Sequence, residues 1–410
     1  MKLPDFPDKP PTGHNKLPAT IENVDHLLKH ADIRVRYNVI KKKDEVAVPG
    51  HQGTMDNLDN VTLSTIVSLA SKHGLPTGHI TDYVQVIADR NAYNPVADWI
   101  RSRPWDGTDR MADICGTVIE QDDYPPVLKI ILIRKWLLSA VAAALMPNGF
   151  KCRGVLTLQG PQGIGKTSWV KALVTDAKLR DEVIKLDHHL DASNKDTILG
   201  AITNWIVEIG ELESSFRKDI ARLKGFLTTD ADRVRRPYGR RESEYARRTV
   251  FLATVNDANF LTDTTGNTRW WTIAAKGLNF LHDIDMQQVF AQLATKLDAG
   301  AEWWLSPDEE QMLDAWNHRH MVVSAIAEKL ATWMDPKGKI VLRLTATQVL
   351  ERMGFQHPTN AQAKECAAAL RTLLGESKRI NGSNRWSVSF NEPPANTWQQ
   401  PLHSQEDEIY

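Results

Sequence analysis

Eight consecutive residues, 160–167, carry the clearest chemical pattern in the chain. A glycine, four free positions and then Gly-Lys-Thr is the pattern of a loop that binds nucleotide phosphates. Glycines allow the tight turns that aim backbone N–H groups at phosphate oxygens, the lysine reaches the β- and γ-phosphates, and the threonine hydroxyl coordinates Mg²⁺. We therefore predict a nucleoside triphosphate and Mg²⁺ bound by Gly160, Pro161, Gln162, Gly163, Ile164, Gly165, Lys166, Thr167 and Ser168.

The residues on both sides of this loop fit the prediction. Residues 154–158 are apolar and predict a short buried strand, and residues 168–174 predict a helix. A helix that begins at the loop adds its N-terminal dipole to the attraction for phosphate. The alternative is a glycine-rich turn that binds nothing. The predicted order of strand, loop and helix disfavours this alternative.

Acidic residues are expected opposite this loop. Residues 204–208 form an apolar run that ends in Glu208, and Glu211 follows one helical turn further on. An acid at the end of such a strand can hold Mg²⁺ or orient the attacking water. We place Glu208 at the metal with Thr167, and which of the two acids orients the water stays open. The alternative is that both carboxylates only solvate a strand end.

Two further polar residues flank predicted strands. The apolar run over residues 249–256 ends in Asn256, whose amide can hold the attacking water near the γ-phosphate. Arg269 lies just before the next predicted strand and is expected to be exposed. The alternative for Arg269 is an ion pair within its own subunit or stacking on Trp270 or Trp271.

A basic cluster lies between the two strand ends. Arginines without an intervening acid, with a tyrosine among them, suit contacts to phosphates and stacking on bases, and a Pro-Tyr-Gly tip suits a hairpin. Because the formal net charge of the chain is −1, nucleic-acid binding has to come from such a local patch. The alternative is a solvated face. The predicted DNA-binding residues are Lys224, Arg233, Arg235, Arg236, Tyr238, Arg240 and Arg241.

The order of these motifs resembles the helicase-like ATPases of the virulence-associated E family, relatives of the superfamily 3 helicases within the AAA+ class. Asn94-Pro95-Val96 and Trp105-Asp106-Gly107 also resemble that family, so the resemblance covers about residues 90–275. It implies an α/β P-loop core, ATP and DNA. The roles it implies are Walker A for residues 160–167, Walker B for Glu208 and Glu211, motif B′ for residues 224–236, sensor 1 for Asn256 and an arginine finger for Arg269. Glu-Ile-Gly-Glu departs from the adjacent aspartates of many superfamily 3 members.

Composition sets broad limits. The three cysteines are scattered and in no metal-ligand spacing, which indicates a reducing compartment without a disulfide framework. The N-terminus does not resemble a signal peptide, and no apolar run approaches membrane-spanning length. We expect a cytoplasmic protein of a bacterial host with no membrane partner.

The C-terminal third predicts a second DNA-binding part. A capping box at residues 306–309 begins a long helix towards residue 335. Two helices, 345–353 and 360–374, and a basic hairpin then resemble a winged helix, whose second helix would enter the major groove. The alternative is a helical module without DNA contact.

We accordingly divide the chain into six parts. These are a flexible lead-in (1–20), a mostly helical N-terminal or collar region (21–150), a P-loop ATPase core (151–276), a helical connector (277–336), a winged-helix-like DNA-binding module (337–392) and a disordered tail (393–410).

The function that the sequence favours is ATP-driven DNA unwinding or translocation that initiates replication of a phage or mobile element. The expected partners are single-stranded and origin duplex DNA, further copies of the chain in a ring, presumed hexameric from the resemblance, and a separately encoded primase. The alternative is an ATP-switched origin-binding or phage-interference protein that does not unwind DNA processively.

Overall fold

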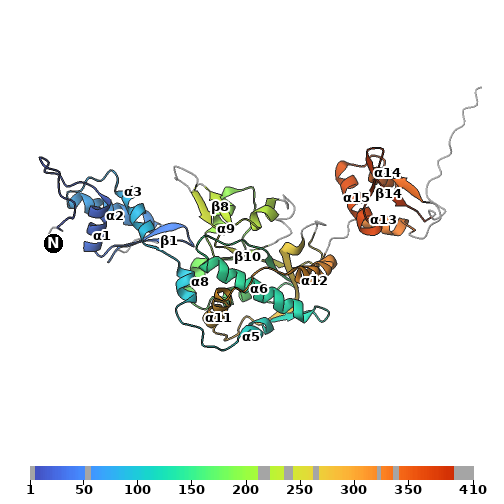
Figure 1. Cartoon of the computed structure of the whole chain (residues 1–410), viewed down its shortest axis with the longest axis horizontal. Coiled ribbons are helices and arrows are strands. Elements are labelled where there is room, and N and C mark those ends of the chain that lie inside the picture. The colour runs from blue at the N-terminus through green and yellow to red at the C-terminus, as the bar shows by residue number, and fades with distance from the viewer. Residues whose placement is uncertain are drawn as a thin grey trace, which may run out of the picture. The chain divides into compact units, whose positions relative to one another are not determined.

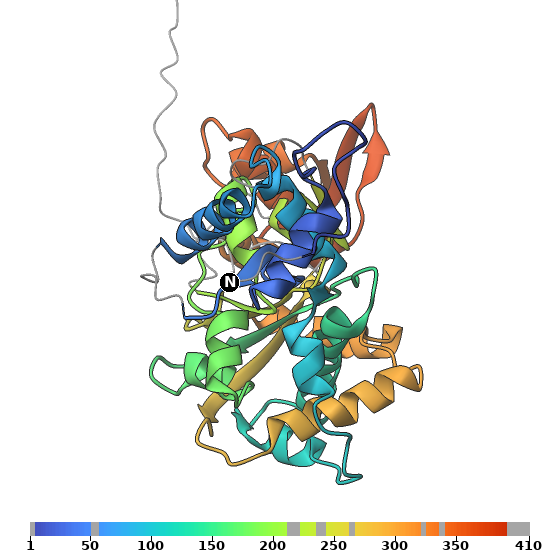
Figure 2. The same cartoon turned by 90° about the vertical axis from the view of Figure 1, so that its left-hand side faces the viewer.

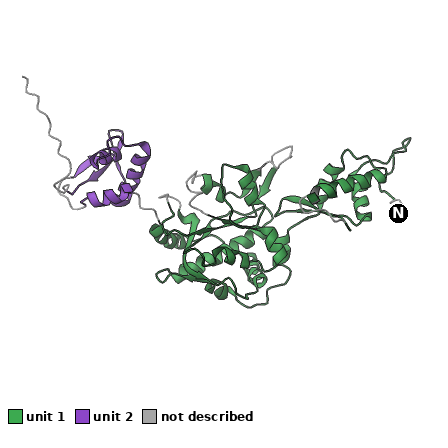
Figure 3. Ribbon diagram, turned by 180° about the vertical axis from the view of Figure 1, so that it is seen from behind, with its two compact units in different colours: residues 1–320 green, residues 321–410 purple. Residues whose placement is uncertain are grey.

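Helices and several separate sheets make up this mixed α/β protein. The computed structural model describes residues 5–50, 57–210, 222–234, 243–261, 267–320, 325–335 and 341–391. The chain divides into two units, residues 1–320 and residues 321–410, drawn green and purple in Figure 3. None of the described helices combines the length and the apolar surface needed to cross a membrane.

Unit 1 begins with three helices and a small sheet, blue in Figures 1 and 2. The sequence predicts helices over residues 24–30, 60–73 and 80–91 and a strand over residues 34–40, each within a few residues of the observed element. The region also holds a three-stranded sheet of order β2-β1-β3, so it is less purely helical than expected. The elements are α1 (Ile21–His30), β1 (Arg34–Asn38), β2 (Lys43–Ala47), α2 (Leu58–Lys72), α3 (Ile80–Arg90) and β3 (Ala92–Tyr93).

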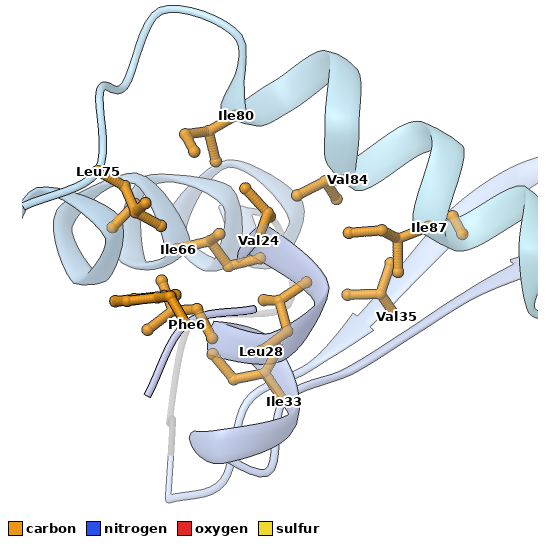
Figure 4. Close-up of a cluster of buried hydrophobic side chains, with 13 residues drawn as sticks. Phe6, Val24, Leu28, Ile33, Val35, Ile66, Leu75, Ile80, Val84 and Ile87 are labelled. Carbon is orange, nitrogen blue, oxygen red and sulfur yellow. The ribbon is translucent and has the colours of Figure 1, made fainter. Parts of the chain in front are cut away.

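These elements share one apolar core, shown in Figure 4. Val24 of α1, Ile66 of α2 and Val84 of α3 are buried there together with Phe6. The described residues 5–20 therefore do not form the free lead-in that their composition predicts. Asn23 fixes this segment, because its side chain bonds to the backbone of Asp8.

The remainder of unit 1 is built around the largest sheet of the protein. Its elements are α4 (Pro95–Ile100), α5 (Met111–Gly116), β4 (Val118–Glu120), α6 (Pro126–Leu145), β5 (Val155–Gln159), α7 (Lys166–Ala172), α8 (Ala177–Val183), β6 (Ile184–Lys185), α9 (Lys195–Ile202), β7 (Ile206–Ile209), β8 (Ala231–Val234), β9 (Ser243–Ala246), β10 (Val250–Val255), η2 (Asn267–Arg269), β11 (Trp270–Leu278), α11 (Met286–Asp298), α12 (Pro307–Asn317) and η3 (His318–His320).

The sheet has six strands in the order β4-β11-β5-β10-β7-β6. Five of them are parallel, and β4 is antiparallel to β11. After β5 the chain passes to β6 at one edge, returns through β7 to β10, and then crosses to β11 on the other side of β5. The strand order reverses at β5, and ligands bind at such a point beyond the carboxyl ends of parallel strands.

Helix α6 packs on this sheet (Figure 1), and two tryptophan side chains hydrogen-bond across the contact. The indole of Trp136 donates to Phe251 O of β10 at 2.7 Å, and that of Trp205 donates to Ala140 O of α6 at 2.8 Å. Most of the helix is buried, whereas Val127, Ile130 and Arg134 are exposed. Lys129, in contrast, is buried and paired with Glu120 of β4.

A buried ion pair joins the two-stranded sheet of β8 and β9 to the large sheet. Arg247 is fully buried, and its guanidinium donates to both carboxylate oxygens of Asp232 in β8 at 2.6 and 2.7 Å. The guanidinium also lies against the rings of Phe226 and Phe251, 4.5 and 5.5 Å from their centroids. This pair therefore fixes the base of the β8–β9 pair against β10.

Unit 2 contains the two helices and the hairpin that the sequence predicts. Its elements are α13 (Ala325–Trp333), β12 (Leu342–Leu344), α14 (Ala346–Arg352), α15 (Asn360–Leu374), β13 (Lys378–Ile380) and β14 (Ser383–Val388), with a sheet of order β12-β14-β13. Capping boxes begin α14 at Thr345 and α15 at Thr359. Its own core includes Leu330, Leu350, Leu370 and Trp386. Residues 393–410, expected to be a disordered tail, lie outside the described residues.

Two helix predictions in this half of the chain are wrong. The capping box at Ser306 is present, but α12 ends at Asn317 instead of continuing towards residue 335. Asn317 is buried and its amide donates to Asn267 O and Trp270 O, so the chain is tied to η2 at this point. The sequence also predicts a helix over residues 278–300, but the observed helix begins only at Met286, because β11 continues to Leu278. Residues 277–336, expected as one connector, are divided between the two units.

We predict that Arg247→Ala lowers the free energy of unfolding of the folded chain by about 3–5 kcal/mol, because it leaves the buried Asp232 carboxylate without its cation. Arg233→Ala is the matched control, since Arg233 pairs with Glu244 on the surface of the same strand pair. It should change stability by less than about 1 kcal/mol. Urea unfolding followed by circular dichroism measures both, and equal midpoints for the two variants would contradict the anchoring role of Arg247.

Candidate nucleotide-binding site

The glycine-rich loop connects β5 to α7, as predicted. Gly165 has a φ of 92°, in the left-handed region that favours glycine, and directly precedes the first residue of α7. Space is also limited there, because a Cβ on Gly165 would lie 2.4 Å from the ring of Phe280. A Cβ on Gly160 would lie 2.2 Å from Ala275 O of β11. The loop is thus packed closely against β11 and the segment that follows it.

Lys166 is held by the loop and by the neighbouring strand end. Its ammonium donates to Gly160 O at 2.7 Å, to Pro161 O at 2.9 Å and to Asn256 Oδ1 at 2.9 Å. Burial lowers the pKa of Lys166, and the charge of Glu208 acts in the opposite direction. The structure therefore brings together Lys166 and Asn256, which are 90 residues apart in the sequence.

Glu208 connects the loop to the middle of the sheet. Its side chain in β7 is 1% exposed, and Oε1 accepts from Thr167 Oγ1 at 2.6 Å and from Thr254 Oγ1 at 3.2 Å. Hydroxyl and carboxylate oxygens are the hard ligands that Mg²⁺ takes, in sites completed by phosphates and water. The donor set of Thr167 and Glu208 fits that ion. Within the described ranges no three His, Cys, Asp or Glu side chains form a metal-binding group.

Sequence reasoning missed three residues at this site. Thr254 lies in β10 two positions before Asn256, and a hydroxyl inside an otherwise apolar strand was the available signal. Asp187 follows β6, has a φ of 48° and donates its backbone N–H to Glu208 Oε2 at 3.4 Å. The local sequence gives no sign that Phe280 belongs to the site, because only the return of the chain after β11 places its ring on Gly165. Glu211 lies outside the described residues.

Arg269 lies at the opposite edge of the sheet. It precedes Trp270, which pairs with Val155 at the start of β5, whereas the loop begins after Gln159 at the end of β5. With about 3.3 Å per strand residue, these two edges are roughly 15 Å apart. Arg269 therefore cannot reach the phosphate loop of its own chain across the sheet.

Arg269 is half-buried, which differs from the exposed position expected for it. Its Nε is buried and has no hydrogen-bond partner among the described residues. The side chain lines a pocket of about 340 Å³ together with Lys151 and Arg153. Three cations thus share this pocket, with Glu310 as its acidic residue.

The predicted DNA-binding cluster is described only in part. Strands β8 and β9 pair antiparallel on either side of the predicted hairpin tip, and Arg233 is exposed. The structure corrects the prediction that Lys224 contacts DNA. Its side chain is buried, with 7% exposed, and is not presented to a ligand on the surface. The remaining predicted contacts, Arg235, Arg236, Tyr238, Arg240 and Arg241, lie outside the described residues.

Comparison with known families gives one match. A family model described as the Virulence-associated protein E-like domain matches residues 100–322, more than half of the chain. The matched region includes the whole six-stranded sheet, α11 and α12. It begins after Asn94-Pro95-Val96 and extends further towards the C-terminus than the resemblance found from the motifs. No curated protein matches the sequence significantly.

Solved structures with a related backbone include "The apo structure of NrS-1 C terminal region (305-718)", at 14% identity and a TM-score of 0.41, covering 90% of this chain and 98% of that chain. Two A-form apo structures of the NrS-1 C-terminal region have TM-scores of 0.36 and 0.37, also at 14% identity. They cover 89% and 90% of this chain and 98% of theirs. Similarity at this level assigns no role to any residue.

We predict that Gly165→Ala weakens the binding of Mg²⁺-ATP at least tenfold. An added Cβ meets the Phe280 ring, and a left-handed φ costs a non-glycine residue roughly 1–2 kcal/mol. Gly354→Ala is the control, because Gly354 has a φ of 95° but open space around it. Isothermal titration calorimetry measures the affinity, and unchanged binding by Gly165→Ala would contradict the assignment of this loop.

Proposed function

Because the chain belongs to the virulence-associated protein E-like family, we propose that it is an ATP hydrolase that acts on DNA during replication of a phage or mobile element. The observation that carries the proposal is the convergence of Lys166, Thr167, Glu208 and Asn256 at one end of the sheet. An ammonium, a hydroxyl, a carboxylate and an amide around a glycine-rich loop are the groups that phosphoryl transfer to water requires.

Each group has a task in the proposed reaction. Backbone N–H groups of the loop and the start of α7 bind the phosphates, and Lys166 neutralises the charge that develops on the transferred phosphoryl group. To do so, its ammonium exchanges the Gly160 and Pro161 carbonyls for phosphate oxygens. The amide of Asn256 lies next to this ammonium, where it can orient the attacking water.

Thr167 and Glu208 would hold Mg²⁺, which supplies Lewis-acid stabilisation of the phosphate oxygens when it is bound. Glu208 suits this role better than the role of the acid that orients water, because its Oε1 already faces the Thr167 hydroxyl at 2.6 Å. The backbone N–H of Asp187 and the hydroxyl of Thr254 fix the orientation of the carboxylate. Glu211 is the candidate for the acid that orients the water.

Two parts of the chain are candidates for contacting DNA. The β8–β9 pair carries Arg233 next to the arginine-rich residues 235–241, and the buried Arg247–Asp232 pair gives it a rigid base. In unit 2, α15 precedes a hairpin that carries Arg379 and Arg385, the order of elements in a winged helix. We propose that the first binds single-stranded DNA and the second binds origin duplex.

The test uses the purified full chain on a forked DNA substrate with Mg²⁺ and ATP. The wild-type protein should hydrolyse ATP and displace the annealed strand. Lys166→Ala should reduce turnover roughly 100-fold or more, because no other cation at the loop replaces it. Lys171→Ala, an exposed lysine of the same helix, is the matched control and should be as active as wild type. ATP hydrolysis without strand displacement would favour the ATP-switched binding protein, and normal turnover in Lys166→Ala would refute the site.

The position of Arg269 in the sheet supports the assembly of several copies into a ring. Since Arg269 lies at the amino edge of the sheet and the loop at the carboxyl edge, an arginine finger at this position would have to serve the loop of another copy. Arginine is suited to this task because its planar group stays charged and can bridge two phosphate oxygens. We propose that copies assemble, as a hexamer if the family resemblance extends to assembly, with each site shared between neighbours.

Mixing two inactive variants tests the shared site. Arg269→Ala should bind ATP normally but lose on the order of 10³ in turnover. Mixing it with Lys166→Ala subunits should restore activity, because an intact loop then meets an intact arginine. The control mixture combines Lys166→Ala with a Lys166→Ala/Arg269→Ala double variant, which contains no intact loop and should stay inactive. Co-purification of differently tagged subunits verifies assembly, and a co-assembled first mixture without activity would exclude the shared site.

A further inference from the structure

A second pocket of unit 1 lies beside the phosphate loop. It has a volume of about 660 Å³, within the range of roughly 300–1,000 Å³ that is usual for small-molecule sites. Two segments form its walls. One is the region of α5, with Arg110, Asp113, Gly116 and Thr117, and the other follows β11, with Asn279 and residues 281–285.

Hydrogen bonds and packing connect both walls to the loop. Thr117 Oγ1 accepts from the indole of Trp169 in α7 at 2.7 Å, and Thr117 O accepts from Asn279 N at 2.8 Å. Phe280, between Asn279 and Leu281, packs its ring on Gly165 of the loop. A molecule whose phosphates occupy the loop would therefore have this pocket next to it, on the β11 side.

The charges of the pocket disfavour a second phosphate site. Arg110 is paired with Asp106 at 2.6 Å, and Asp285 is paired with Arg103 at 2.8 Å. Asp113 and Asp283 then leave the walls with an excess of negative charge, which repels phosphate. An uncharged group with polar edges suits these walls better.

His282 supplies the polar atoms for such a group. Both of its ring nitrogens are buried and have no hydrogen-bond partner among the described residues. Burial lowers the pKa of His282, and Asp283 opposes this shift. A neutral imidazole offers one donor and one acceptor, which match the edge of a nucleobase once the ring turns from its buried position to face the pocket. Next to it, Leu281 is 84% exposed and can cover the face of a ring.

We propose that this pocket receives the nucleoside part of the triphosphate, with the base contacting His282 and Leu281 and the ribose hydroxyls facing Asp113. The inference rests on the proposed function of the loop and adds the residues that select the base.

Measuring the affinities for two ligands separates the contribution of the nucleoside from that of the phosphates. We expect a Leu281→Ala/His282→Ala double variant to bind Mg²⁺-ATP at least tenfold more weakly than wild type, because the base loses its apolar contact and its hydrogen bonds. The same variant should bind Mg²⁺-tripolyphosphate within about twofold of wild type. A matched double variant, His79→Ala/Leu373→Ala, removes an exposed histidine and an exposed leucine elsewhere and should change neither affinity.

The outcomes distinguish this inference from the proposed function. If the wild type binds neither ligand, the proposed function fails and the inference fails with it. If the wild type binds both, and the double variant binds ATP normally or loses both ligands equally, only the inference fails. Photolabelling of the unmodified protein with 8-azido-ATP checks the site without any substitution. Label on residues 279–285 or 110–117 supports the pocket, and label confined to other peptides overturns it.

Discussion

One buried carboxylate, that of Glu208, connects four parts of the chain. It belongs to β7, accepts from Thr167 at the start of α7 and from Thr254 of β10, and receives a backbone N–H from Asp187 after β6. A carboxylate that is 1% exposed is stable only with such partners, since an unsatisfied buried charge is costly. The requirement to satisfy Glu208 therefore fixes how the loop, the strands and the turn after β6 lie relative to one another.

The parallel sheet imposes a second constraint. All parallel strands end at the same edge, so the glycine-rich loop, Glu208 and Asn256 meet there although they are distant in the sequence. Arg269 precedes a strand instead of following one, and the same geometry places it at the other edge with Lys151 and Arg153. In the proposed mechanism, this separation means that each nucleotide site is formed by two neighbouring copies.

A second set of buried contacts lies at the base of the β8–β9 pair, which would contact DNA in the proposed function. Arg247 and Asp232 form an ion pair in the interior, with the aromatic rings of Phe226 and Phe251 against the guanidinium. Burial of such a pair requires closely matched geometry, which makes it a specific joint between β8 and β10.

The sequence by itself determined the features that depend on neighbouring residues. The Gly-Lys-Thr pattern predicts the loop between β5 and α7, and apolar runs that end in Glu208 and Asn256 predict strand ends that meet at it. Capping boxes and helical periodicity likewise predict where α12, α14 and α15 begin. Such signals are local, because turns, caps and alternating burial involve residues a few positions apart.

Only the tertiary structure decided the remainder. Residues 5–20 have the composition of a free segment, yet Phe6 enters a core built by three helices. Helix α12 ends where Asn317 meets η2 and the start of β11, 50 and 47 residues away in sequence, and no local pattern marks that position. Lys224 belongs to a basic stretch but is buried, and Phe280 reaches Gly165 only after β11 has crossed the sheet. In each case the deciding contact joins segments far apart in the chain, and its free energy outweighs the local preference.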